Sequence, residues 1–189
     1  MATKAELRAA YLVRRQGLTE AEWAARSFQV AQHLFDQVTF TPEDTVHVFI
    51  PIARKRELDT WPIIRGLWER GCTVVVPISD MASKTMQQAR LLPDTPLAEV
   101  GYGMQEPADP ELVPSSQITQ VLVPLLVVDQ QGHRIGYGGG FYDRFFERIS
   151  PQVTRIGLSL ESPIDDIPEV HEQDVPLQGC ITPKGYVAF

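Results

Sequence analysis

The hydrophobic positions change their spacing along the chain, from helical near the N-terminus to short apolar runs further on. Residues 3–16 and about 19–37 are predicted to form helices. The apolar runs that follow predict strands, the longest of which is nearly apolar over eight residues, as a strand buried on both faces would be. The predicted strands cover residues 45–50, 73–77, 121–128, 154–160 and 177–182.

The second predicted helix has a clear start. Thr19 and Glu22 form a capping box, in which each side chain accepts a hydrogen bond from the backbone of the other residue. The apolar side chains expected to face the core are Trp23, Phe28, Ala31, Leu34 and Phe35.

A third helix is predicted between two of the strands. Asp59 or Thr60 caps it, Pro62 lies in its first turn and Gly71 ends it. Strands that alternate with helices are typical of βαβ units on a parallel sheet. We therefore expect one α/β domain over residues 1–189, with a mainly parallel central sheet flanked by helices on both faces.

Two stretches lack a regular pattern. Residues 93–118 contain five prolines, and we expect an irregular excursion packed over one edge of the functional site. Residues 161–174 are expected to form an acidic loop that is broken by prolines.

Composition narrows the class of protein. Hydrophobic residues make up 43% of the chain and charged residues 22%, as in an ordinary globular domain. The net charge of −7 argues against a general binder of nucleic acid or anionic membranes, so a phosphate site has to be a local cluster of cations. Because we find neither an apolar run of about 18 residues nor a signal peptide, we expect a cytoplasmic protein outside the membrane. We also expect a monomer. Cys72 and Cys180 lack metal-ligand spacing and are expected to be reduced and buried.

The segment after the longest strand carries the strongest candidate for chemistry. A turn at residues 129–132 leads to a glycine cluster, after which a helix begins at Phe141. Such a loop presents backbone N–H groups to an anion. It is neither a dinucleotide motif, which would need a glycine in place of Phe141, nor a Walker loop. A tight turn without a ligand is the alternative, but four glycines in five positions favour a ligand. They are Gly136, Gly138, Gly139 and Gly140.

Charged residues suited to a phosphate site occur near this loop and far from it in sequence. Lys4 and Arg8 share one face of the first helix, and Arg134 precedes the loop. A solvated basic face is the alternative for the first two. Asp143 and Asp174 offer carboxylates that Mg²⁺ would use beside phosphate oxygens, although Asp143 is also an ordinary residue for a helix start.

The segment PLLVVDQQGHRIGYGGGFYDRFF resembles the signature of the 5-formyltetrahydrofolate cyclo-ligase family, whose members are also called methenyltetrahydrofolate synthetases. Lys4 and Arg8 match the N-terminal K-x-x-x-R of that family. Residues 57–60, 104–107 and 172–174 resemble further segments, so the resemblance spans nearly the whole chain.

The resemblance implies an α/β enzyme that uses ATP and Mg²⁺ to convert 5-formyltetrahydrofolate into 5,10-methenyltetrahydrofolate, with release of ADP and phosphate. By position, Lys4 and Arg8 would contact ATP. Asp143 and Asp174 would serve the metal, and Ile50 and Glu57 would line the folate pocket. Arg134 and Tyr142 are the implied catalytic residues. The implied nucleotide loop comprises Arg134, Ile135, Gly136, Tyr137, Gly138, Gly139, Gly140, Phe141 and Tyr142, of which Tyr137 to Phe141 also border the folate.

Other interpretations stay open at this point. One is a sugar-phosphate isomerase or acyl-CoA transferase that needs no ATP, and another is a nucleotide-sensing module without turnover. Residues 54–56 are all basic and are interpreted as a solvated turn, with contact to the glutamate tail of folate as the alternative. His47 is expected to be an ordinary strand residue.

Overall fold

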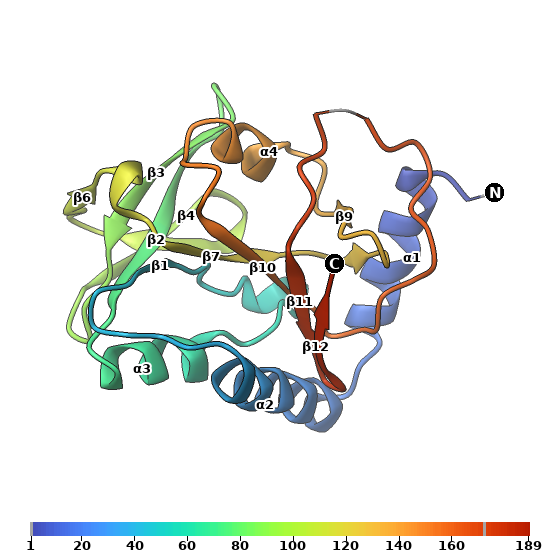
Figure 1. Ribbon diagram of the computed structural model, residues 1–189, viewed down its shortest axis with the longest axis horizontal. Coiled ribbons are helices and arrows are strands. Elements are labelled where there is room, and N and C mark those ends of the chain that lie inside the picture. Colours follow the sequence, from blue (N-terminus) through green and yellow to red (C-terminus); the bar gives the residue numbers. More distant parts are fainter. Residues whose placement is uncertain (1, 172) are drawn as a thin grey trace.

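A central eight-stranded sheet organises the fold of the computed structural model, which describes residues 2–171 and 173–189 (Figure 1). The helices are α1 (Lys4–Gln16), α2 (Glu20–Gln37), α3 (Trp61–Glu69) and α4 (Phe141–Phe146), and the 3₁₀ turns are η1 (Ala53–Lys55), η2 (Gly101–Gly103) and η3 (Ser115–Gln117). The strands are β1 (Thr45–His47), β2 (Thr73–Asp80), β3 (Thr85–Arg90), β4 (Leu97–Val100), β5 (Met104–Pro107), β6 (Leu112–Val113), β7 (Gln120–Pro124), β8 (Val127–Val128), β9 (Arg134–Ile135), β10 (Thr154–Leu158), β11 (Gly179–Thr182) and β12 (Gly185–Ala188).

The strands of the large sheet follow the order β12-β11-β10-β7-β1-β2-β3-β6. Strands β11 to β2 in this order pair in parallel, whereas β12, β3 and β6 pair antiparallel at the two edges. Strand β1 lies in the middle, where Val46 pairs with Val74 of β2 and with Gln120 of β7. The expectation of an α/β domain with a mainly parallel sheet is confirmed.

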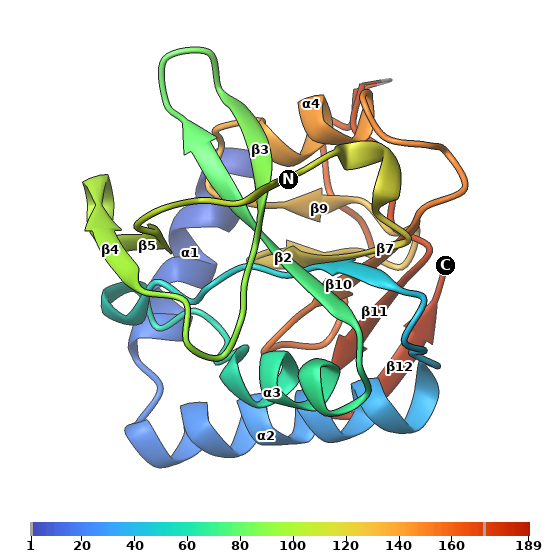
Figure 2. The same ribbon diagram turned by 90° about the vertical axis from the view of Figure 1, so that its left-hand side faces the viewer.

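Helices cover both faces of this sheet. Figure 2 shows α2 and α3 on one side and α4 on the other. Successive residues of a strand point to opposite faces. Val74 and Val76 therefore pack in the cluster beneath α2 and α3, whereas Val75 packs in the cluster that contains Phe145 and Phe146 of α4. Each of these side chains is at most 6% exposed, and burying one of this size contributes about 1.5–3 kcal/mol.

Helix α2 begins as expected and turns four of the five expected side chains toward the core, since Ala31 and Leu34 are buried and Trp23 and Phe35 pack against the same cluster. The Thr19 hydroxyl accepts from Glu22 N at 3.2 Å and the Glu22 carboxylate accepts from Thr19 N at 2.8 Å, which confirms the capping box. The inward position expected for Phe28 is wrong, since this residue is 57% exposed. Phe28 is one position, about 100°, further round the helix than the buried Ser27. The buried residues of the helix are Ser27, Val30, Ala31 and Leu34.

Residues 93–118 are more regular than their prolines suggest. Strands β4 and β5 form an antiparallel hairpin whose turn uses positive φ at Tyr102 (67°) and Gly103 (74°), and β6 pairs with β3. The expectation of an irregular stretch is therefore wrong. Four of the five prolines lie between the strands, and the fifth, Pro107, is the last residue of the edge strand β5, where a missing N–H does not interrupt a ladder.

Two expectations drawn from composition can be compared with the structure. Cys72 and Cys180 are free and buried, as expected. Among the residues that the structure describes, we find no helix with both the length and the apolar character of a membrane span.

Candidate functional site

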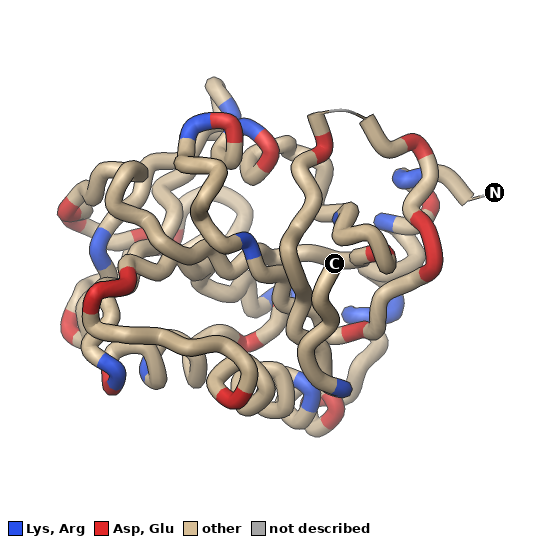
Figure 3. Tube along the Cα trace, in the orientation of Figure 1, with Lys and Arg blue, Asp and Glu red and all other residues tan. Residues whose placement is uncertain are grey.

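The candidate site lies where the chain leaves the carboxyl ends of β1, β7 and β10, which are neighbours in the sheet. The segments after these strands carry Glu57, the glycine loop (residues 136–140) and the acidic loop (residues 161–174). Ligands of open α/β sheets commonly bind outside the carboxyl ends of the strands. Helix α1 packs against β8 and β9 at this end, and its basic positions lie beside acidic positions of the acidic loop (Figure 3).

Arginine side chains hold the glycine loop, which joins β9 to α4. Arg8 Nε of α1 donates to the carbonyl oxygen of Gly136 at 2.9 Å. Arg144 Nη1 of α4 donates to the carbonyl oxygens of Gly139 at 3.0 Å and Gly140 at 3.1 Å. The acceptor side of the loop backbone is thus occupied by cations, which favours the use of its N–H groups for an anion.

Two of the glycines have backbones that other residues rarely adopt. Gly138 has a φ of +89° and Gly140 a φ of +68°. A Cβ at Gly138 would also lie 3.3 Å from Arg8 Cζ, whereas a Cβ at Gly136 would meet nothing within 4 Å. The loop therefore requires glycine at 138 and 140 for its conformation, while position 136 adjoins open space.

The cations and carboxylates predicted from the sequence form a continuous series of contacts. Lys4 Nζ lies 2.5 Å from Asp174 Oδ2. The next residue, Val175, accepts a hydrogen bond from Arg134 Nη1 at 2.7 Å, and Arg134 Nη2 lies 2.6 Å from Asp143 Oδ1. The fold thus brings together residues that are up to 170 positions apart in sequence.

The two carboxylates differ from a preformed metal cage. The side chains of Asp143 and Asp174 are 34% and 29% exposed, and each already has a cationic partner. Burial opposes ionisation of Asp174, but hydrogen bonds from His171 N and Lys4 outweigh it and hold its pKa below the ordinary value. Within the described part of the chain, no group of three or more His, Cys, Asp or Glu could hold a metal ion. A divalent ion here would need phosphate oxygens and water besides these carboxylates, which is the usual ligand set of Mg²⁺.

Glu57 presents a carboxylate from a buried position after β1. It is 4% exposed, and Oε2 accepts from Ile52 N at 2.7 Å. Burial raises the pKa of Glu57, although the Ile52 N–H, the Tyr137 hydroxyl and the cations of Arg15 and Lys55 oppose this shift. Glu57 therefore lies near the Tyr137 hydroxyl of the glycine loop. The sequence-based assignment of both residues to one folate pocket stays a prediction. Ile50, also assigned there, is 7% exposed.

Tyr142 of α4 is anchored by a histidine to which sequence reasoning gave no role. The Tyr142 hydroxyl lies 2.9 Å from His47 Nε2, and His47 Nδ1 lies 2.6 Å from Gln88 Oε1. Because an amide oxygen only accepts, we assign the ring proton to Nδ1, so that Nε2 accepts the hydroxyl proton of Tyr142. Burial lowers the pKa of His47 to about 4, against the hydrogen bond to Gln88. Burial likewise raises the pKa of Tyr142, which keeps its hydroxyl protonated.

Asp129 organises the turn before β9. Its side chain is wholly buried, and Oδ1 accepts from the N–H groups of Gln131 and His133 at 2.9 Å each. Oδ2 accepts from Ile167 N and lies 3.1 Å from His133 Nδ1. Asp129 therefore fixes the entry into the glycine loop and ties the acidic loop to it.

The basic residues 54–56 do not form the solvated turn that we expected. Arg54 is exposed, but Lys55 and Arg56 are half-buried. Lys55 Nζ lies 4.1 Å from the centroid of the Tyr137 ring, and Arg56 Nη1 donates to Leu18 O at 2.6 Å. The turn is folded back onto the site and onto the end of α1.

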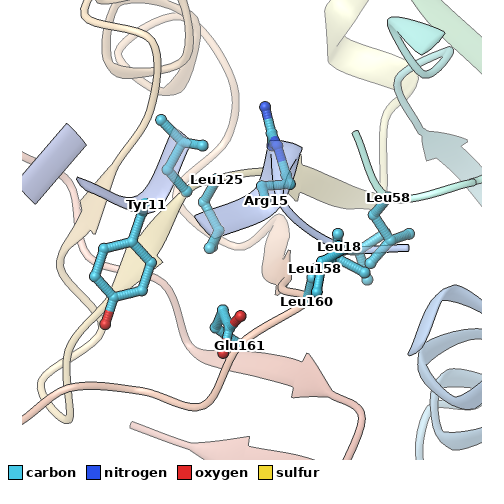
Figure 4. Close-up of a pocket in the computed structure, with 9 residues that line it drawn as sticks. Tyr11, Arg15, Leu18, Leu58, Leu125, Leu158, Leu160 and Glu161 are labelled. Atoms are coloured by element: carbon cyan, nitrogen blue, oxygen red, sulfur yellow. The ribbon is translucent and has the colours of Figure 1, made fainter. Parts of the chain in front are cut away.

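Two cavities near this end of the sheet do not include the glycine loop. One, of about 20 Å³, lies among side chains of α1, β10 and the segment after β7 (Figure 4), and has room for about one water molecule. The other, of about 300 Å³, lies at the outer side of α1 and is lined by Asp165 and Asp166, whose charge is unsuited to a phosphate. The lining residues of the first are Tyr11, Arg15, Leu18, Leu58, Leu125, Leu126, Leu158, Leu160 and Glu161.

The fold and this end of the sheet define an α/β protein with a glycine loop held by cations beside the carboxyl ends of its parallel strands. Comparison with known proteins supplies the family. Residues 1–183 match the 5-formyltetrahydrofolate cyclo-ligase family, and the chain therefore belongs to this family of enzymes.

Individual relatives agree with this assignment. The chain is 28% identical over 175 residues to the 5-formyltetrahydrofolate cyclo-ligase of Escherichia coli K12, and the matched region covers 90% of this chain and 95% of that protein. It is 32% identical over 154 residues to the 5-formyltetrahydrofolate cyclo-ligase of Mycolicibacterium smegmatis, which covers 77% of each chain.

Solved structures show the same fold. The 5,10-methenyltetrahydrofolate synthetase of Aquifex aeolicus superposes with a TM-score of 0.76 at 25% identity, covering 98% of this chain and 92% of that chain. The synthetase of Mycoplasma pneumoniae gives a TM-score of 0.73 at 21% identity, covering 96% and 99%.

Proposed function

We propose that this protein converts 5-formyltetrahydrofolate into 5,10-methenyltetrahydrofolate and consumes ATP, with Mg²⁺ as cofactor and ADP and phosphate as further products. Membership of the family supports the folate substrate and product. The observation that carries the proposal is the convergence of Lys4, Arg8 and Asp174 on the segment Arg134–Asp143, from three distant parts of the sequence.

The cations of this cluster are suited to a triphosphate. Lys4 and Arg134 are each paired with a carboxylate, and Arg8 with a loop carbonyl. Phosphate oxygens are stronger partners for such groups than a carbonyl is, because the hydrogen bond is charge-assisted on both sides. We assign the nucleotide to these three cations and to the loop from Arg134 to Tyr142.

Asp143 and Asp174 fit a magnesium ion that is bound together with the nucleotide. Both carboxylates are accessible, and both lie beside cations that phosphate oxygens would engage instead. The ion would supply further neutralisation of the phosphate charge.

The folate would lie on the other side of the glycine loop. Ile50 offers an apolar surface, and the buried carboxylate of Glu57 is an acceptor for N–H groups of a pterin ring. The loop from Tyr137 to Phe141 would separate and border both substrates, since Tyr137 meets Glu57 while the adjacent Gly136 is bound to Arg8.

The proposed chemistry has two steps. The N5-formyl oxygen attacks the γ-phosphorus, the bond from this phosphorus to the bridging oxygen breaks, and ADP leaves. N10 then attacks the activated formyl carbon, phosphate leaves with the formyl oxygen, and N10 loses its proton as the ring closes. Phosphoryl transfer mainly requires positioning and neutralisation of charge, to which Arg134 is suited. Tyr142, whose hydroxyl is held by the buried His47, would act by positioning the start of α4 beside the reactants.

One assay tests the reaction directly. Purified protein is given 5-formyltetrahydrofolate, ATP and MgCl₂, and the absorbance of the methenyl product is followed together with ADP. We expect one ADP for each product molecule and no product without ATP or with excess EDTA. Arg134→Gln should abolish turnover, whereas Arg148→Gln, an exposed site just beyond α4, should be neutral. Product formation without ATP would refute the proposal.

The same assay addresses the other interpretations. ATP binding without product would indicate a nucleotide sensor. The isomerase and transferase interpretations lose support because the chain belongs to a different family.

A further inference from the structure

A cluster around the Tyr137 side chain is not explained by the proposed reaction. It consists of Tyr137 of the glycine loop, Arg15 at the end of α1, Lys55 of η1 and Glu57 after β1. Sequence reasoning gave Arg15 no role in the site and considered Lys55 only as an alternative contact to the glutamate tail of folate. The two cations lie against the Tyr137 ring, and the buried carboxylate lies near its hydroxyl.

Arg15 is the most enclosed member of the cluster apart from Glu57. It is 8% exposed, although it lies on a surface helix whose neighbouring Arg14 is exposed. Its Nη2 donates to the Tyr137 hydroxyl, and its Cζ lies 5.4 Å from the centroid of the Tyr137 ring. Figure 4 shows its side chain directed away from Glu161, so the nearest acidic residue of that cavity is not its partner.

Arg15 also has an N–H group without a partner. Within the described part of the chain, its Nε is buried and makes no hydrogen bond. Burying an arginine in this way is unfavourable unless the rest of the guanidinium is well used. The guanidinium bonds to the Tyr137 hydroxyl and its charge acts on Glu57, which links Arg15 to this cluster.

Helix α1 thus holds the glycine loop at two points. Arg8 and Arg15 are seven residues apart, which is two turns, so they share a face of the helix. Arg8 binds the backbone of the loop at Gly136, and Arg15 binds the side chain of the next residue, Tyr137. Lys55 packs on the Tyr137 ring at 4.1 Å and closes the cluster.

We propose that Arg15 is a positioning residue that fixes the Tyr137 side chain beside Glu57 and thereby shapes the folate side of the glycine loop. This inference deepens the proposed function and rests on it for the identity of the substrate. The hydroxyl bond sets the direction of the Tyr137 ring, and the Tyr137 hydroxyl lies near the Glu57 carboxylate. The three cations assigned to the nucleotide, Lys4, Arg8 and Arg134, take no part in the contact between Arg15 and Tyr137.

The kinetic test compares Arg15→Met, Tyr137→Phe and the double variant with the unmodified protein. We expect each single variant to raise the KM for 5-formyltetrahydrofolate by about tenfold to a hundredfold, as for loss of a hydrogen bond from a charged group. The KM for ATP should change less than about twofold. The double variant should be no worse than the poorer single one, because both substitutions remove the same contact. Arg15→Lys should restore part of the loss. Arg14→Met, whose guanidinium stacks on Tyr11 instead, is the matched control and should be neutral.

A second measurement needs no substrate. Hydrogen exchange of the loop amides 136–140 should become faster in Arg15→Met and in Tyr137→Phe, and stay unchanged in Arg14→Met. Unchanged exchange would overturn the positioning role whether or not the protein has the proposed activity. In an active protein, additive effects of the two substitutions, or equal rises in both KM values with a large fall in Tm, would overturn it as well. If the variants show this exchange pattern but the unmodified protein forms no product, the proposed function alone is refuted.

Discussion

Acidification should destabilise the protein through His47 before its carboxylates are protonated. Burial lowers the pKa of His47 from 6.5 to about 4, so the folded state binds this proton less readily than the unfolded state does. The contribution of His47 is therefore fully present above pH 6.5 and is lost as the pH falls toward 4. The difference of the two pKa values corresponds to about 3 kcal/mol in all, of which about 2 kcal/mol should be lost by pH 5.

Urea unfolding at pH 7, 6 and 5 measures this contribution. Other groups titrate as well, so the informative quantity is the difference between the unmodified protein and His47→Gln. His47→Gln should be less stable at pH 7, because it loses the bridge from Gln88 to Tyr142, but its stability should fall less between pH 7 and 5. His33→Gln, at a half-buried position of α2, is the matched control. Parallel curves for the unmodified protein and His47→Gln would show that the histidine is not held neutral by burial.

Three further substitutions test the glycine loop and its surroundings. Gly138→Val should abolish ATP binding, measured by calorimetry, because the φ of +89° at Gly138 and the 3.3 Å distance from its Cβ position to Arg8 Cζ exclude a branched side chain. Retained ATP affinity would refute the role of the loop. The control Gly136→Ala should leave the Tm unchanged. Asp143→Ala should lower kcat at least a hundredfold with little change in Tm, and a large fall in Tm would instead indicate a structural residue. Asp129→Ala should lower the free energy of unfolding, measured with urea, by about 3 kcal/mol or more, because it leaves buried N–H donors without a partner. A loss below about 1 kcal/mol would contradict the structural role of Asp129.

Much of the fold was accessible from local pattern. The runs at 73–77 and 121–123 are apolar because parallel strands are covered on both faces, and that requirement is written directly into consecutive residues. Capping at Thr19 is equally local, since the partners lie three residues apart. The edge strands β4, β5 and β12 were missed because one-sided burial in four residues leaves almost no periodic signal.

The candidate site also has features that local sequence predicts and features that it does not. The positive φ values in the loop are satisfied by glycines that the sequence displays at Gly138 and Gly140, and the charges of Lys4 and Asp174 are suited to phosphate and metal wherever they lie. The contacts that site residues make in the folded protein could not be predicted from the sequence. A buried histidine inside an apolar strand gives no sign that it will meet a tyrosine, and an arginine near a helix end resembles any solvated one.

The sequence by itself determined the α/β class, the glycine loop and the charged residues that mark its chemistry, because each depends on residues close together in the chain. Only the tertiary structure decided that Arg15 meets Tyr137 and that His47 meets Tyr142, across 122 and 95 residues. These contacts depend on which strands become neighbours in the sheet and on where α1 docks. Both are set by packing over the whole domain, which no local pattern specifies.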